Sequence, residues 1–153
     1  MSTITTARSA TAAGLDPRGP RFAASLTSVA LAVVLVAPAP VAVTVLALQT
    51  VVFAVGALRG IQHTPYAWLF RTAVRPRLAA PHELEDPRPP RFAQAVGLGF
   101  AVVGLLGFAS GLTAIALVAT GFALAAALLN AVFGFCLGCE LYLLYQRGAH
   151  HGG

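Results

Sequence analysis

Long apolar runs dominate this chain. Four of them, over residues 17–37, 41–58, 91–109 and 112–135, each approach the ~20 residues that a helix needs to cross a ~30 Å hydrocarbon layer. The breaks within each pair of runs are short, with Pro38 and Pro40 in the first and Ser110-Gly111 in the second. Proline and glycine at these places end one helix and start the next. The pattern therefore predicts an all-α polytopic membrane protein of four transmembrane helices arranged as two hairpins, over residues 16–147.

Composition agrees with this class. Apolar residues make up 58% of the chain, charged residues 10%, and the mean hydropathy is +0.79, whereas soluble domains carry roughly 25% charged residues. The formal net charge of +5 comes from ten basic residues, all of them arginine. Because the arginines flank the apolar runs and form no continuous stripe, membrane lipid is the expected anionic partner and nucleic acid is not.

The placement of the arginines also predicts an orientation. Three lie before or at the start of the first run, six lie between the end of the second run and the start of the third, and one follows the fourth, so neither short turn holds any. By the positive-inside rule, both termini and the middle loop are cytoplasmic. The absence of lysine and the abundance of alanine, valine, glycine and proline suggest a GC-rich bacterial genome. We therefore expect a multi-pass protein of the bacterial inner membrane.

A short motif occurs twice. The sequence Asp-Pro-Arg-Gly-Pro-Arg-Phe-Ala at residues 16–23 recurs as Asp-Pro-Arg-Pro-Pro-Arg-Phe-Ala at residues 86–93, an offset of 70 residues. Each copy introduces one hairpin, which predicts an internal duplication with repeats at 16–80 and 86–147 and a pseudo-twofold axis along the membrane normal. Residues 1–15 and 148–153 are expected to be disordered tails.

The repeated motif and the middle loop supply candidate contacts to lipid headgroups. In the motif, the aspartate can cap a helix and the arginines can meet phosphates. A further amphipathic helix is predicted to start at Thr64-Pro65 and to lie on the inner leaflet, with Trp68, Arg71 and Arg75 on the face opposite its other aromatic and aliphatic side chains. The predicted headgroup contacts are Arg18, Arg21, Arg88, Arg91, Arg71, Arg75 and Trp68.

The two cysteines of the chain, Cys136 and Cys139, form a C-x-x-C pair where the last apolar run ends. If the fourth helix continues to residue 145, both thiols share one helical face, one turn apart. If Gly134 breaks the helix, Cys136 lies at the start of a new helix, whose dipole favours the thiolate. Glycine is poor in a helix interior, which favours the second arrangement. Glu140 follows directly as a possible accessory proton acceptor.

Three chemistries fit the pair. A reducing cytoplasm disfavours a structural disulfide, which leaves a reactive dithiol, half of a Zn²⁺ or Cu(I) site, or two inert packing residues. For a metal, the pair supplies two of four ligands, and the candidates for the others are His63, His82, His150 and His151. For a dithiol, Cys136 is the expected attacking thiolate and Cys139 the resolving one.

The leading hypothesis is exchange of electrons or sulfur with a soluble thioredoxin-like or sulfurtransferase partner, with no cofactor. Whether this makes the protein an enzyme stays open. The alternative is a non-enzymatic module that binds metal or scaffolds a partner. A small-solute carrier is third, because no ionisable residue lies in the middle of any predicted span.

Two motifs carry a resemblance to a known family. The run Asp-Pro-Arg-Pro-Pro-Arg-Phe-Ala-Gln at 86–94 and the run Gly-Phe-Cys-Leu-Gly-Cys-Glu-Leu-Tyr at 134–142 resemble a family of small, uncharacterised bacterial four-helix membrane proteins, defined as a domain of unknown function. The likeness covers residues 16–147 and implies a setting among thioredoxin-like and sulfurtransferase proteins. The helix-end C-x-x-C is also similar to that of quinone-linked disulfide-forming enzymes. This chain lacks their second cysteine pair, and its pair is predicted to face the other compartment, so the likeness is an analogy only.

Overall fold

The computed structural model describes residues 14–152, and this part of the chain is all-helical, with six α-helices and no named strand. Most of the predicted N-terminal tail, residues 1–13, lies outside the described residues. The four long helices are α2 (Arg18–Val36), α3 (Ala39–Leu58), α5 (Arg88–Ala109) and α6 (Thr113–Phe133). All four are long and apolar enough to cross a membrane, which confirms the four predicted spans to within a few residues.

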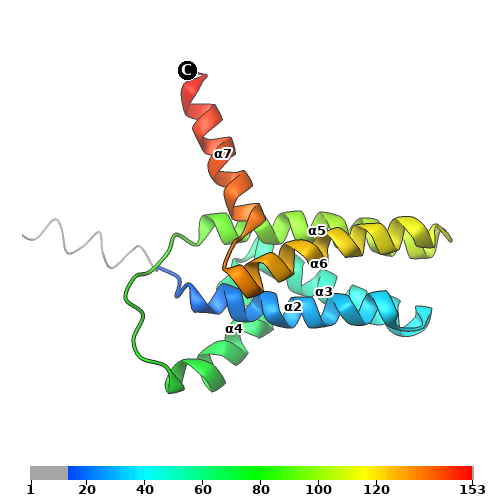
Figure 1. The fold of residues 1–153 in the computed structure, drawn as a ribbon, viewed down its shortest axis with the longest axis horizontal. Helices are drawn as coiled ribbons and strands as arrows, with labels where there is room; N and C mark the ends of the chain where they lie inside the picture. The colour runs from blue at the N-terminus through cyan, green and yellow to red at the C-terminus, as the bar shows by residue number, and fades with distance from the viewer. Residues whose placement is uncertain (1–13, 153) are drawn as a thin grey trace, which may run out of the picture.

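Proline and glycine end the spans where the sequence indicated. Ala37 is extended before Pro38, which separates α2 from α3, because proline disfavours the helical conformation in the residue before it. In the second hairpin, α5 ends at Ala109 and Gly111 takes a positive φ of 76°. Both hairpin turns lie at one end of the bundle, and the start of α2 and the end of α6 lie at the other (Figure 1).

The four spans form a closed ring in the order α2, α3, α5, α6, so that α2 and α6 are also neighbours. Leu31, Val34, Leu46 and Phe53 anchor the core that they share. Only 17% to 33% of the residues in each span are buried, and many large apolar side chains on the outer faces are exposed. Exposed apolar surface of this extent is typical of helices that contact lipid, because its exposure to water is unfavourable.

A short helix follows the first hairpin. It is α4 (Pro65–Leu69), which continues as a π-helical turn over Phe70–Val74 and a 3-10 turn over Arg75–Arg77. The predicted cap is confirmed, because Thr64 Oγ1 accepts a hydrogen bond from the Ala67 N–H at 3.2 Å. Figure 1 shows α4 beside the bundle at the end opposite the two hairpin turns.

A chain of polar side chains fills the space between α4 and the first hairpin. The Tyr66 hydroxyl donates to Gln49 Oε1 at 2.7 Å, and Gln49 Nε2 donates to Thr27 Oγ1 at 3.3 Å. Gln49 is only 1% exposed, so its amide depends on these partners. The chain links α2, α3 and α4 through side chains that satisfy each other.

The two copies of the repeated motif make matching contacts. Asp16 Oδ1 accepts the Arg18 backbone N–H at 3.0 Å, and Asp86 Oδ1 accepts that of Arg88 at 2.9 Å. Each aspartate also forms an ion pair with the same arginine. Just before the motifs, residues 15 and 85 form an isolated antiparallel bridge with two hydrogen bonds of 2.9 Å. These residues are themselves 70 positions apart, so the bridge joins equivalent points of the two copies.

The second arginine of each motif caps a helix of the other hairpin. Arg21 Nη2 donates to the carbonyls of residues 131 and 132 at the end of α6, at 3.4 and 3.2 Å. Arg91 donates to the carbonyls of residues 57 and 58 at the end of α3, both at 2.7 Å. Arginine at these places satisfies carbonyls that lack a partner within the helix and complements the helix dipole. The duplication of the two hairpins stays a prediction.

The last helix, α7 (Leu137–His151), projects away from the bundle at the same end as α4 (Figure 1). It packs on α5 through Tyr142 and Phe92, whose ring centroids are 5.6 Å apart. Phe70 packs on Phe22 of α2 in the same way, at 5.8 Å. The helix continues past Arg147 into the segment that was expected to be a disordered tail.

Candidate functional site

The C-x-x-C pair lies where α6 ends and α7 begins. Gly134 takes a left-handed conformation with a φ of 67°, and its N–H bonds to the carbonyl of Asn130. Glycine is the residue that tolerates this conformation without strain, and it ends many helices. The chain then turns and starts α7 at Leu137, with Cys136 as the N-cap. Of the two predicted arrangements, the one in which Gly134 breaks the helix is confirmed.

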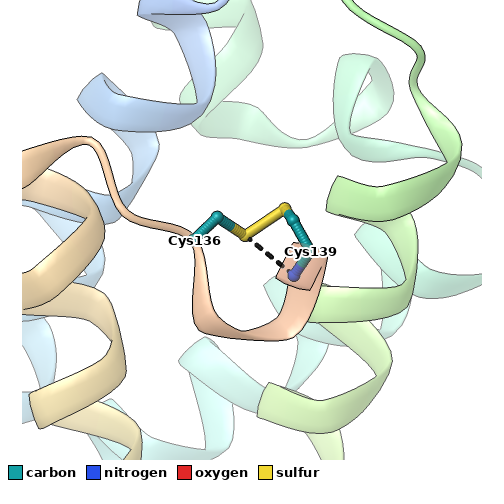
Figure 2. Close-up of a disulfide and its surroundings, with 2 residues drawn as sticks. All are labelled: Cys136 and Cys139. Atoms are coloured by element: carbon teal, nitrogen blue, oxygen red, sulfur yellow. Dashed lines mark hydrogen bonds between the residues drawn. A yellow bond between two sulfur atoms is a disulfide. The ribbon is translucent and has the colours of Figure 1, made fainter. Parts of the chain in front are cut away.

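Cys136 and Cys139 are joined as a disulfide with a Cα–Cα separation of 5.2 Å, within the usual range for such bonds. Figure 2 shows the pair between α5 and the segment that leaves α6. The sequence led us to expect free thiols. The two sulfurs lie within bonding distance of each other, which is the spacing that the oxidised form of a dithiol requires.

The Cys136 sulfur occupies a position suited to negative charge. Its Sγ accepts a hydrogen bond from the Cys139 backbone N–H at 3.2 Å, drawn as the dashed line in Figure 2. The backbone N–H groups of the first turn of α7 give this end of the helix a partial positive charge. When the disulfide is reduced, this end therefore favours the thiolate form of Cys136, which is the nucleophile in thiol exchange.

The disulfide lines a cavity of about 470 Å³ at the same end of the bundle. Its walls come mainly from α2, α5 and α6, and α7 closes one side. Most lining side chains are apolar, and the polar ones are few: Arg21, Thr27, Glu85, Gln94 and Asn130. Small-molecule sites typically have such a volume and such a lining. The structure thus brings Arg21 and the two cysteines, all singled out from the sequence, to one cavity.

The other predicted site residues lie elsewhere. Arg18 and Arg88 pair with aspartates, Arg91 caps α3, and Arg71 Nη1 donates to the Gln62 carbonyl at 2.6 Å. Arg75 and Trp68 are exposed on α4 and the turn that follows it, and Glu140 is exposed on the first turn of α7. None of these seven residues lines the cavity. Their contact with lipid headgroups, and the accessory role of Glu140, stay predictions.

A metal site at the cysteines would need further ligands. Within residues 14–152, no group of three or more histidine, cysteine, aspartate and glutamate side chains is placed to hold an ion. The four histidines named as candidate ligands therefore form no such group with the pair. Binding of Zn²⁺ or Cu(I) stays an alternative that would require ligands from a second molecule.

The cavity is the part of the site that the sequence did not predict. Gln94, Gly97 and Asn130 line this space, and none of them was singled out from the sequence as a site residue. The sequence feature that could have indicated the cavity is the small size of residues that face one another from different helices. Gly97, Ala123 and Gly138 all line the cavity, but without the ring order of the helices nothing places them together.

Fold and site define a small helical protein of membrane type, in which one cysteine caps the last described helix, a second lies in its first turn, and both line a cavity. The chain belongs to the family described as a domain of unknown function, DUF4395, whose model matches residues 15–147. This match bears out the family resemblance that the two motifs suggested. No curated protein and no solved structure matches the chain.

Proposed function

We propose that this protein is an integral protein of the bacterial inner membrane whose Cys136–Cys139 pair exchanges electrons or sulfur with a soluble thioredoxin-like or sulfurtransferase protein. The observation that carries the proposal is the geometry of the pair. One sulfur caps a helix, the second lies in the first turn, and the two are close enough to form and break a disulfide. Dithiol proteins of the C-x-x-C type use this combination of proximity and helix-end electrostatics.

The exchange follows ordinary thiol–disulfide chemistry. A thiolate of the reduced partner attacks the Cys136 sulfur, and the S–S bond to Cys139 breaks to leave the Cys139 thiolate. The second partner thiolate then attacks the partner's own sulfur in the mixed disulfide, which releases the oxidised partner and the reduced pair. In reverse, Cys136 attacks a partner disulfide and Cys139 resolves it. For sulfur transfer, the thiolate of reduced Cys136 would attack the outer sulfur of a persulfide on the partner, the partner's S–S bond would break, and the partner would leave as a thiolate while Cys136 becomes the persulfide.

A cytoplasmic location for the pair is part of the proposal. All nine arginines within residues 14–152 lie outside the two hairpin turns, which supports the orientation in which the termini and α7 face the cytoplasm. We expect a C-terminal reporter that is active only in the cytoplasm to be active, and one that is active only in the periplasm to be silent. Activity of the periplasmic reporter would contradict the orientation.

Trapping of the mixed disulfide tests the exchange itself. Cys139→Ser leaves Cys136 able to attack a partner disulfide but removes the resolving thiol. We expect this variant to accumulate a covalent complex with a thioredoxin-like partner that dithiothreitol releases. The matched variant Cys136→Ser should form far less. Equal trapping by both variants, or by neither, would contradict the roles assigned to the attacking Cys136 and the resolving Cys139. Zinc retained by the reduced wild-type protein would favour the metal-binding alternative.

A further inference from the structure

We infer that the cavity beside the disulfide binds a membrane-soluble quinone, which takes two electrons from the reduced cysteine pair. This inference rests on the proposed redox function and names the second substrate of the same site. A pair that exchanges electrons with a soluble partner needs another reactant to restore its redox state. The cavity places room for that reactant against the sulfurs.

The lining of the cavity fits a neutral ring with carbonyl groups. Its walls are mostly apolar, and the side-chain amides of Gln94 and Asn130 offer N–H donors among them. Arg21 adds a positive charge near the end of α6, where it is held by the carbonyls of residues 131 and 132. Such donors complement quinone oxygens, and the guanidinium stabilises the negative charge that develops on them during reduction. Glu85 is the single acidic residue of the lining.

The cavity also reaches the lipid-facing surface. Phe100 of α5 and Phe122 of α6 both line it, yet they are 36% and 62% exposed, and their ring centroids are 6.2 Å apart. Both lie in the middle of spans, where exposed side chains contact acyl chains. The cavity therefore faces the acyl chains at the α5–α6 side, and a ligand dissolved in the bilayer would reach the sulfurs by parting these two rings, with no passage through water.

The first hairpin shows that this space is not an unavoidable consequence of the fold. There, the chain from Tyr66 through Gln49 to Thr27 occupies part of the corresponding region, and the cavity beside α4 is smaller, about 200 Å³. The matching contacts of the two halves give an alignment for each pair of helices. The N-cap Thr64 aligns with Cys136 for α4 and α7, the capped carbonyl of residue 57 with that of residue 131 for α3 and α6, and Phe22 with Phe92 for α2 and α5. In that alignment, the three filling side chains correspond to Gly138, Ala123 and Gly97. The second half lacks these side chains at the place where it carries sulfur.

The proposed step is balanced by two electrons and two protons. A thiolate of the reduced pair adds to a ring carbon of the quinone, and the other thiolate attacks the first sulfur. The S–C bond breaks as the S–S bond forms, its electron pair passes to the ring, and the two protons of the dithiol end on the two oxygens of the hydroquinone. The products are the disulfide and the hydroquinone.

The test uses the full-length protein, purified in detergent and reduced, with decylubiquinone as the probe. Its ring is fully substituted, which limits non-specific addition of thiols. We expect the ultraviolet absorbance of the quinone to fall as two thiols disappear for each quinone reduced. Ala126→Phe, which fills the cavity, should slow this reaction at least tenfold. Ala125→Phe, at an exposed neighbouring position on the same helix that does not line the cavity, should leave the rate within twofold.

Two outcomes would overturn the inference: equal rates for the two alanine variants, or no reduction faster than that by free dithiothreitol. If Ala126→Phe does not fold, Gln94→Leu provides the second test, with a raised KM for the quinone as its expected result. Co-purification of phospholipid in the cavity in place of quinone would also contradict it. The trapping of a thioredoxin-like protein by Cys139→Ser reports separately on the proposed function, so failure of the quinone reaction alone leaves that function standing.

Discussion

The helices that follow the two hairpins start in the same way and differ in chemistry. At the start of α4, Thr64 Oγ1 accepts the N–H of the residue three positions on, and at the start of α7 Cys136 Sγ does the same, both at 3.2 Å. The third residue after the cap is Ala67 in α4 and Cys139 in α7. A capping position needs only an acceptor atom. Sulfur at that position keeps the cap and adds a nucleophile, so the fold can gain redox chemistry without a new backbone.

The strongest way to break this comparison is to give the second half the cap of the first. Cys136→Thr retains an acceptor but removes the disulfide. We expect complete loss of two-thiol oxidation, measured by maleimide-polymer mass shifts before and after a mild oxidant, and a Tm close to that of the reduced wild type. Serine at Cys139 is the matched control for loss of one thiol. Oxidation to an internal disulfide in Cys136→Thr is chemically excluded, so any residual activity would place the reaction elsewhere.

The close approach of α7 to α5 provides the next test. A Cβ on Gly138 would lie 2.6 Å from the Cα of Ala93, a distance that only a backbone shift can relieve. We expect Gly138→Ala to destabilise the protein by about 1–3 kcal/mol, as overpacking does, and to slow thiol exchange because α7 is displaced. Gly148→Ala, on the same helix with open space around its position, should be neutral or slightly stabilising. Thermal unfolding in detergent measures both, and equal effects would contradict the packing.

In the first half, the buried polar chain is the feature to disturb. Tyr66→Phe leaves the Gln49 Oε1 acceptor without its hydroxyl donor in a buried site. A lost partner of this kind costs about 1–3 kcal/mol, so we expect a lower Tm with no change in thiol reactivity. Tyr145→Phe, at a side chain that is 72% exposed, is the control. A change in thiol reactivity in Tyr66→Phe would show that the two halves are coupled in a way that the structure does not explain.

The two reciprocal arginine caps sharpen the comparison further. Arg21→Met and Arg91→Met each remove hydrogen bonds to helix-end carbonyls, and we expect each to cost about 1 kcal/mol, because both side chains are exposed. Only Arg21 lines the cavity, so only its variant should also slow quinone reduction. If both variants slow quinone reduction equally, the two arginines affect this reaction only through the stability of the fold.

The smallest expected effect concerns acid. Hydrogen bonds from the Arg18 side chain lower the pKa of Asp16, and those from Arg88 lower the pKa of Asp86. A carboxyl whose pKa is lower in the folded state stabilises the fold above its unfolded pKa, near ~3.9, and this contribution is lost as the pH falls through the folded pKa. The free energy of unfolding, measured between pH 7 and pH 3, should therefore fall below about pH 4. This fall should be smaller in Asp16→Asn than in the wild type. Asp86→Asn should show a smaller effect, because Asp86 is 43% exposed and Asp16 only 8%.

Much of this architecture could be predicted from the sequence. The spans follow from the apolar runs, their ends from Pro38, Gly111 and Gly134, and the Thr64 cap from its place before a proline. These signals are local, and each acts through the backbone of its own segment. The break between α6 and α7 could be predicted over a continuous helix because Gly134 is also a local signal, and glycine readily takes the left-handed conformation that ends a helix.

The contacts between segments could not be predicted in this way. Nothing local indicates that Arg21 caps α6 or that Arg91 caps α3, and we assigned both to lipid. The cavity could not be predicted for the same reason. It depends on which spans are neighbours and on where their facing residues have small side chains. Length, hydropathy and spacing describe one helix at a time, whereas the ring order that joins α2 to α6 is a property of the assembled bundle.

The bridge between Leu15 and Glu85, together with the two crossed arginine caps, has a consequence for how the chain can be divided. Each hairpin supplies one half of every one of these links, and the linker at 78–84 contributes none of them. A gene cut between codons 81 and 82 would therefore yield two fragments that still recognise each other when produced together. The sulfur-bearing fragment could then be exchanged, labelled or mutated independently of its companion.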